Sequence, residues 1–89
     1  MRIKKGFVLR NVCGENVVMG EGLDAIDFGR LLCLNETAVR LFELATAMGD
    51  FTVEALAGEM VKEYDVEIDV ARADAQEVVD RWIEMGVAE

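Results

Sequence analysis

Residues 30–38, Arg30-Leu31-Leu32-Cys33-Leu34-Asn35-Glu36-Thr37-Ala38, contain the point at which the chain is expected to change from strand to helix. The run Arg30–Leu34 is short and mostly apolar, and its length suits a strand better than a helix. Asn35 is a favourable helix N-cap, and Glu36 follows in the first turn, where the helix dipole favours negative charge. The stretch therefore predicts a strand that leads directly into a helix.

Downstream of this junction, apolar residues recur at helical spacing in three successive segments. Asn35 and Gly49 would bound the first helix, Thr52 would cap the second, and Asp69 would cap a third that ends near Gly86. The predicted apolar stripes are Ala38, Leu41, Phe42, Ala45 and Met48 in the first helix, Val53, Leu56, Ala57, Met60, Val61 and Tyr64 in the second, and Ala75, Val78, Val79, Trp82 and Ile83 in the third.

Upstream of the junction, the sequence favours strands. Phe7–Cys13 is rich in apolar and β-branched residues, Gly14–Asn16 supplies turn residues, and Val17–Met19 follows at once, which predicts a hairpin. A connection over Leu23–Gly29 leads to the third strand. The expected fold class is therefore α+β: one domain over residues 1–89, with a three-stranded antiparallel sheet followed by a three-helix bundle, similar in shape to a winged helix.

Charge is distributed unevenly over the 89 residues, whose net charge is -9. Residues 1–34 carry five basic and four acidic groups, whereas residues 35–89 carry four basic and fourteen acidic groups. An acidic surface repels the phosphate backbone, so we do not expect nucleic acid as a partner. Basic peptides and basic protein surfaces fit this charge better.

The chain has no apolar segment of the ~18–20 residues needed to span a bilayer, so no membrane partner is expected. Its basic start, Met1–Lys5, is followed by an apolar stretch that Arg10 interrupts, a pattern that does not fit a signal peptide. The sequence thus favours a cytoplasmic location, where Cys13 and Cys33 would be free thiols. Both are expected to be small buried residues within strands.

Catalytic and metal-binding patterns are weak. The chain has no histidine, which removes histidine-dependent triads and most zinc sites, and its two cysteines are not in a CxxC spacing. Asp65, Glu67 and Asp69 alternate with apolar residues and lack the glycine of a calcium loop, so they are interpreted as a solvated turn. We therefore expect no enzyme activity, no catalytic residue, no metal and no cofactor.

Strands beside three helices could also form a winged-helix regulator, in which the third helix would enter the major groove. Here that helix would present mostly carboxylates to the phosphates: Asp69, Asp74, Glu77, Asp80 and Glu84 stand against only Arg72 and Arg81. A transcriptional regulator of this shape, or a protein-interaction adaptor, remains the alternative function.

An open sheet of three strands has two edges, and each edge presents unpaired N–H and C=O groups. One use of such an edge is β-augmentation, in which an extended peptide pairs with the edge strand and places alternate side chains in pockets. Trp82, the single tryptophan, allows two interpretations: a core residue that closes the domain, or an aromatic wall of a peptide groove.

Five segments of the sequence resemble the PqqD family and its relatives, the recognition elements for ribosomally made precursor peptides. The similarity runs through most of the chain, and its most specific part is Leu34–Ala38 at the strand-to-helix junction. The other matching segments are Gly6–Arg10, Phe51–Val53 with Leu56, Glu63–Val66 and Trp82–Val87. The connection Glu21–Gly29 looks longer than in PqqD proper and lacks its Pro-Glu-Gly, so we expect a divergent branch.

The resemblance implies a non-catalytic peptide chaperone that binds a leader peptide as an added strand and presents it to a modifying enzyme, often a radical-SAM maturase. The peptide would pair with the edge Asp27–Leu34 and pack on the third helix. The implied peptide-binding residues are Asp27, Phe28, Arg30, Leu31, Leu32, Cys33 and Leu34 on the edge, and Ala75, Val78, Val79 and Trp82 on the helix. A free edge could also pair with its own copy, so a homodimer is a further expected state.

Overall fold

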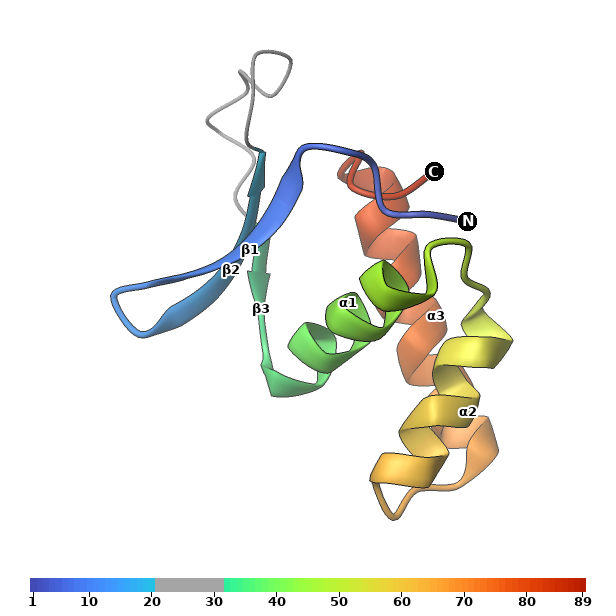
Figure 1. Ribbon diagram of the computed structural model, residues 1–89. Helices are drawn as coiled ribbons and strands as arrows, with labels where there is room; N and C mark the ends of the chain where they lie inside the picture. The colour runs from blue at the N-terminus through green and yellow to red at the C-terminus, as the bar shows by residue number, and fades with distance from the viewer. Residues whose placement is uncertain (21–31) are drawn as a thin grey trace.

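The computed structural model describes residues 1–20 and 32–89 and shows strands on one side of a group of helices (Figure 1). The element order is β1 (Phe7–Val12), β2 (Glu15–Gly20), β3 (Leu32–Leu34), α1 (Glu36–Met48), α2 (Val53–Glu63) and α3 (Ile68–Glu84). The strands form an antiparallel sheet in the order β1-β2-β3. This arrangement confirms the predicted α+β fold of strands followed by helices.

The hairpin between β1 and β2 turns at Cys13 and Gly14, whose φ angles are 53° and 84°. Two residues with positive φ form the primed turn whose twist matches the twist of the paired strands. The turn predicted at Gly14–Asn16 therefore lies earlier in the chain, and Cys13 belongs to the turn and not to a strand. Asn16 belongs to β2, and its Oδ1 accepts a hydrogen bond of 3.2 Å from the side chain of Asn11.

The register of the sheet decides which strand residues face the helices. Leu9, Val18 and Leu32 lie opposite one another across the three strands, and all three belong to or pack on the hydrophobic core. Cys33 lies opposite Val17, so its side chain belongs to the other face of the sheet and is exposed. The prediction that Cys13 and Cys33 are buried was wrong for both: a turn tip and an outward-facing strand position leave them at the surface.

The first two helices begin at the predicted caps. The side chain of Asn35 accepts a hydrogen bond of 2.8 Å from the Ala38 N–H, and Thr52 accepts one of 3.0 Å from the Ala55 N–H. Gly49 ends α1 with a φ of 77° and donates its N–H to Ala45 O at 3.1 Å. The Asn35 cap fixes the junction between β3 and α1, while Gly49 and Thr52 fix the end of α1 and the start of α2.

The third helix begins earlier than predicted. α3 starts at Ile68, with Glu67 as an N-cap that makes no side-chain hydrogen bond. Asp69 therefore lies inside the first turn and faces Arg72, with Oδ1 at 3.4 Å from Nη1. The prediction that Asp69 caps the helix was wrong because a carboxylate in the first turn also suits the helix dipole, and the sequence pattern does not separate the two positions.

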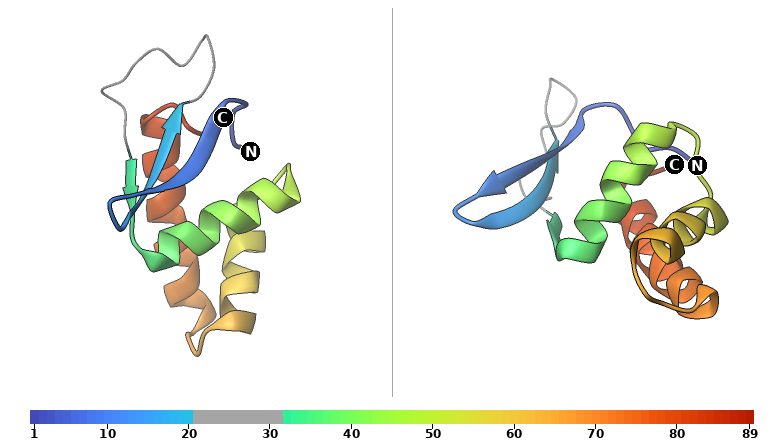
Figure 2. Two further views of the ribbon diagram at one scale, coloured as in Figure 1. Left: turned by 60° about the vertical axis from the view of Figure 1, so that its left-hand side comes forward. Right: turned by 60° about the horizontal axis from the view of Figure 1, so that its bottom comes forward.

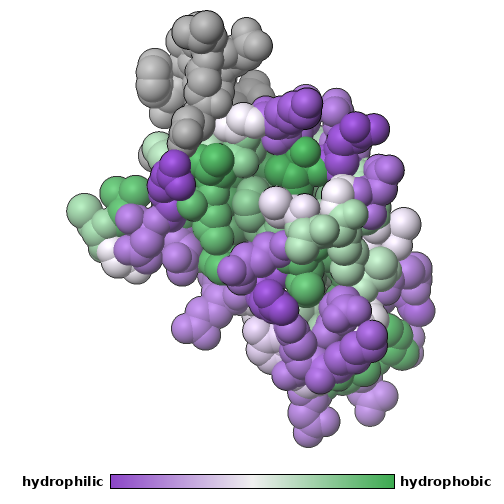
Figure 3. Space-filling view, in the orientation of Figure 1, coloured by the Kyte–Doolittle hydropathy of each residue, from purple (hydrophilic) through white to green (hydrophobic). Residues whose placement is uncertain are grey.

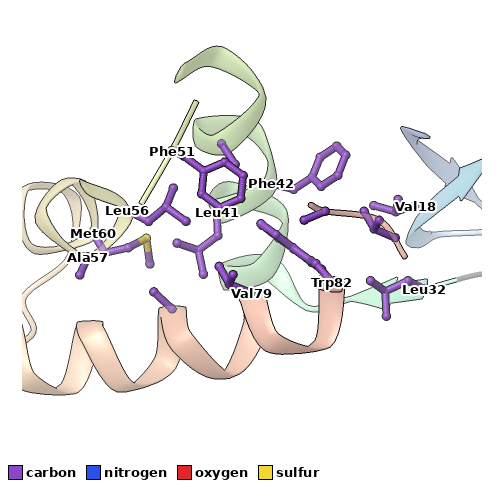
Figure 4. Packing of buried hydrophobic residues seen from close by; sticks show 14 of the residues in the cluster. Val18, Leu32, Leu41, Phe42, Phe51, Leu56, Ala57, Met60, Val79 and Trp82 are labelled. Carbon is purple, nitrogen blue, oxygen red and sulfur yellow. The ribbon is translucent and has the colours of Figure 1, made fainter. Parts of the chain in front are cut away.

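The core lies between the three helices and the inner face of the sheet (Figure 4). Trp82 has no exposed surface and meets Phe42 and Phe51 edge-on, with ring centroids 5.7 and 6.2 Å apart. The outer members of the predicted stripes are half exposed, since Val61, Tyr64 and Ile83 keep 37%, 42% and 46% of their surface. The stripes predicted from spacing were therefore wider than the surfaces that the helices bury.

Both chain termini lie close together, as Figures 1 and 2 show. Arg2 N–H donates to Glu89 O at 2.9 Å, and Glu89 N–H donates to Arg2 O at 3.0 Å. Ile3 forms a β-bridge with Ala88 beside these bonds. Within the described part of the chain, no helix is long and apolar enough to cross a membrane.

Candidate functional site

The third strand occupies one edge of the sheet. β3 pairs with β2 through Val18–Leu32, Val17–Cys33 and Asn16–Leu34. Within residues 1–20 and 32–89, no strand pairs with the other side of β3. The strand thus ends the sheet beside α3, and its free side is the first component of the candidate site.

Strand alternation identifies the backbone groups that face outward. A two-residue turn makes Val12 and Glu15 a hydrogen-bonded pair, so every second β2 residue, including Val17, directs its N–H and C=O groups to β1. Asn16 and Val18 must then bond to their β3 partners. Leu32 and Leu34 consequently face β2, and Cys33 directs its N–H and C=O groups to the open edge.

A cleft of about 130 Å³ lies between the end of β3, the start of α1 and the C-terminal half of α3. It continues into a second hollow that also touches Thr37 and Asp74. We call the two together the β3–α3 groove; its lining residues are Cys33, Leu34, Asn35, Thr37, Ala38, Asp74, Glu77, Val78, Arg81 and Trp82. The open edge and the groove share Cys33 and so form one continuous surface.

The groove has an apolar floor and a charged rim. Ala38 and Trp82 are buried beneath it, while Leu34 and Val78 are half-buried and pack on the core. Glu77 and Arg81 are exposed on the side formed by α3. Such a surface suits an extended chain that places an apolar side chain on the floor and polar side chains on the rim.

The structure separates the predicted site residues into three groups. Asp27, Phe28, Arg30 and Leu31 lie outside the described residues. Cys33, Leu34, Val78 and Trp82 line the groove. Leu32, Ala75 and Val79 belong to the core, where Leu32 keeps 7% of its surface and the other two keep none. The three core residues thus support the groove from beneath, and whether the groove residues contact a peptide stays a prediction.

Sequence reasoning missed polar positions that line the groove. Asp74, Glu77 and Arg81 were interpreted only as part of the charge of the third helix, and Asn35 only as a cap. The signal was present in the spacing, because Asp74, Val78 and Arg81 are four and three residues apart on one helical face. The sequence does not place that face beside β3, because this depends on how α3 packs.

The described residues do not arrange groups for catalysis or metal binding. Within residues 1–20 and 32–89, no three histidine, cysteine, aspartate or glutamate residues gather so as to hold a metal ion. The pKa of Glu63 is lowered, first by its hydrogen bonds with Arg40, which links α1 to the end of α2 with an Nε–Oε2 distance of 2.8 Å. Neither residue of this pair lines the groove, so the lowered pKa of Glu63 reflects the packing of α1 on α2 and not a binding site.

A larger hollow, about 380 Å³, lies between the N-terminal segment and the end of α1. Arg2, Lys4 and Lys5 contribute to its lining. The backbone of this segment is already paired with the C-terminus, since Lys4 N–H donates to Val87 O at 2.9 Å. It therefore lacks the open strand edge that distinguishes the β3–α3 groove.

Comparison with known proteins supplies two findings. The family model described as Coenzyme PQQ synthesis protein D (PqqD) matches residues 15–88. Among solved structures, the fold is similar to "TbiB1 in Complex with the TbiA(beta) Leader Peptide", with a TM-score of 0.78 and 17% sequence identity, over 100% of this chain and 95% of that chain. No curated protein matches the chain.

Proposed function

The chain belongs to the PqqD family, and on that premise we propose that it binds the leader of a ribosomally made precursor peptide and presents it to a modifying enzyme. PqqD-like recognition elements are generally non-catalytic, and we propose the same of this chain. The leader would add to β3 as a further strand and pack on α3. The observation that carries the proposal is the outward-facing backbone of Cys33 beside the β3–α3 groove.

The energetics of the described contacts are compatible with reversible binding. The two outward groups of Cys33 would contribute ~0.5–1.5 kcal/mol each as hydrogen bonds. One aliphatic side chain buried on the floor beside Val78 would add ~1.5–3 kcal/mol. The proposed site also includes Asp27, Phe28, Arg30 and Leu31, which would supply additional edge contacts. The loss of any one of these contacts should therefore change the free energy of peptide binding measurably.

The proposed partner enzyme is a maturase, for which a radical-SAM enzyme is the candidate class. The helical half supports an electrostatic docking surface, because residues 35–89 carry fourteen acidic against four basic groups. On the face of the molecule that Figure 3 shows, hydrophilic residues cover much of the end formed by α2 and α3. A basic enzyme surface would complement this acidic half.

The winged-helix regulator is not favoured. A DNA-reading α3 would have to bring exposed Asp74, Glu77 and Asp80 against phosphates, with Arg72 already paired to Glu54 at 2.7 Å. The open edge of β3 could instead pair with a second copy, a homodimer that a bound peptide would displace. Free thiols at Cys13 and Cys33 support our proposal of a reducing, cytoplasmic location.

A random-peptide display library, selected on the immobilised full chain, tests the proposal with no assumption about the sequence of the leader. We expect extended peptides to be enriched and to perturb the backbone amides of β3 and the groove side of α3 in NMR titrations. Enriched peptides that perturb only the N-terminal hollow, or no enrichment at all, would contradict the proposal. A size measurement with and without peptide reports on the homodimer.

A further inference from the structure

The two ends of the β3–α3 groove carry opposite charges. The hollow nearer the start of α1 is lined by Asp74 and Glu77 together with Asn35 and Thr37. Arg81 contributes only to the other part, which Glu77, Cys33 and Trp82 also line. The groove therefore runs from an acidic end, which Asp74 lines, past Glu77 to a basic end at Arg81, further along α3.

Among the described residues, these charged side chains form no ion pair. All three, Asp74, Glu77 and Arg81, are exposed. The other arginine of α3, Arg72, is instead held by Glu54 and Asp69. Arg81 and the two carboxylates are thus available to a bound chain.

The directions of β3 and α3 determine which end of a bound peptide would lie at the acidic end of the groove. β3 runs toward Asn35, at the acidic end, and α3 runs in the opposite sense, as Figures 1 and 2 show. Antiparallel pairing is slightly more stable than parallel pairing, and the existing strands are antiparallel. A guest strand antiparallel to β3 would enter at the acidic end and leave beside Arg81.

The distance along α3 sets the spacing. Asp74 and Arg81 are seven residues apart, which is about 10.5 Å along a helix axis. A strand rises about 3.3 Å per residue, and its alternate side chains face the same side. Three facing side chains, at positions i, i+2 and i+4 of a bound peptide, cover about 13 Å, which is enough to reach from the acidic end past Val78 to Arg81.

We propose that this groove selects leaders in which a basic residue, an aliphatic residue and an acidic residue occur at alternate positions in that order from N- to C-terminus. The inference rests on the proposed function and adds its substrate class. The basic side chain lies beside Asp74 and Glu77, the aliphatic one contacts Val78, and the acidic one meets Arg81. The preference weakens as salt increases, because exposed charges are screened.

Display selection on the wild-type chain and on Arg81→Glu tests this order. We expect the wild type to enrich peptides with the order basic, aliphatic, acidic. The Arg81→Glu variant should enrich peptides with a basic residue in place of the acidic one. Arg72→Glu makes the same charge change on the same helix outside the groove, and it should keep the wild-type order. Arg81→Gln, which should only lose the acidic preference, covers the case in which Arg81→Glu fails to fold.

Two blocked synthetic peptides of identical composition, with Lys, Leu and Glu in this order or reversed, give the quantitative test. The forward peptide should bind the wild type roughly tenfold more tightly at low salt, since two exposed charge pairs become two repulsions on reversal. If the enriched peptides show no charge order, or if the forward and reversed peptides bind with equal affinity, the inference is overturned and the proposed function stays intact. Failure to enrich any peptide overturns both.

Discussion

Val17 of β2 lies directly opposite Cys33 of β3, and this pairing turns the backbone of Cys33 away from the sheet. Because Val17 bonds to β1, its partner Cys33 has no hydrogen bonds to give to β2. The N–H and C=O groups of Cys33 are therefore exposed beside the β3–α3 groove. The consequences for binding can be tested residue by residue.

Cys33→Pro should weaken peptide binding and leave the fold intact. Proline removes the outward N–H, whose hydrogen bond is worth ~0.5–1.5 kcal/mol, and no bond to β2 depends on that group. We expect a roughly threefold to tenfold loss of affinity for a display-selected peptide, measured by calorimetry.

Two controls accompany this variant. Cys33→Val keeps the N–H and should bind like the wild type. Leu32→Pro removes a bond to Val18 instead and should lower the midpoint of thermal unfolding. If Cys33→Val and Cys33→Pro lose affinity equally, the side chain matters and the backbone account is wrong.

Val78→Asp should reduce affinity by about tenfold or more, because it places a charge where an aliphatic side chain of the guest would be buried at a gain of ~1.5–3 kcal/mol. The half-buried Val78 makes the change tolerable for folding. Ile83→Asp is the matched control on the same helix, since Ile83 is 46% exposed and does not line the groove. Equal affinity losses in both variants, measured by titration, would refute the placement of the peptide.

Trp82→Ala should act on stability first. The indole is fully buried between Phe42 and Phe51, and truncation of such a side chain costs ~3–5 kcal/mol. Urea denaturation should show a large fall in the free energy of unfolding, and a smaller one for Trp82→Phe. A variant Trp82→Ala with wild-type stability and lost binding would instead make Trp82 chiefly a groove residue.

The Arg40–Glu63 pair predicts a specific pH dependence. Its hydrogen bonds lower the pKa of Glu63 below the ordinary value of 4.5, so the stabilisation is present at neutral pH and is lost as the pH falls through the lowered pKa. The wild type should be more stable than Glu63→Gln at neutral pH, and the difference should shrink in acid. A difference that stays constant between neutral pH and pH ~2 would exclude this linkage.

Local signals in the sequence predicted the elements that position the site. Asn35 and Thr52 formed the expected caps because their side-chain oxygens bond within one turn of themselves. The strand before Asn35 was found as Leu32–Leu34. These features depend on neighbours in sequence, so the junction between β3 and α1 could be predicted from the chain alone.

The packing of α3 against β3 could not be predicted in the same way. Ala75, Val78, Val79 and Trp82 share one apolar stripe, and spacing alone does not distinguish the core residues from Val78 at the groove. The uniform run Leu31–Leu34 also gave no alternation from which to orient the strand. The orientation of Cys33 followed only from the register of the whole sheet.

The exchange rate of the Cys33 backbone amide, with and without a display-selected peptide, tests the central claim most directly. In the free protein this amide should exchange quickly, as an outward group without a sheet partner does. Bound peptide should slow it strongly, while the Leu32 amide, already bonded within the sheet, changes little. Slow exchange of Cys33 in the free protein, or no change when the peptide saturates the chain, would contradict the open edge on which the function depends.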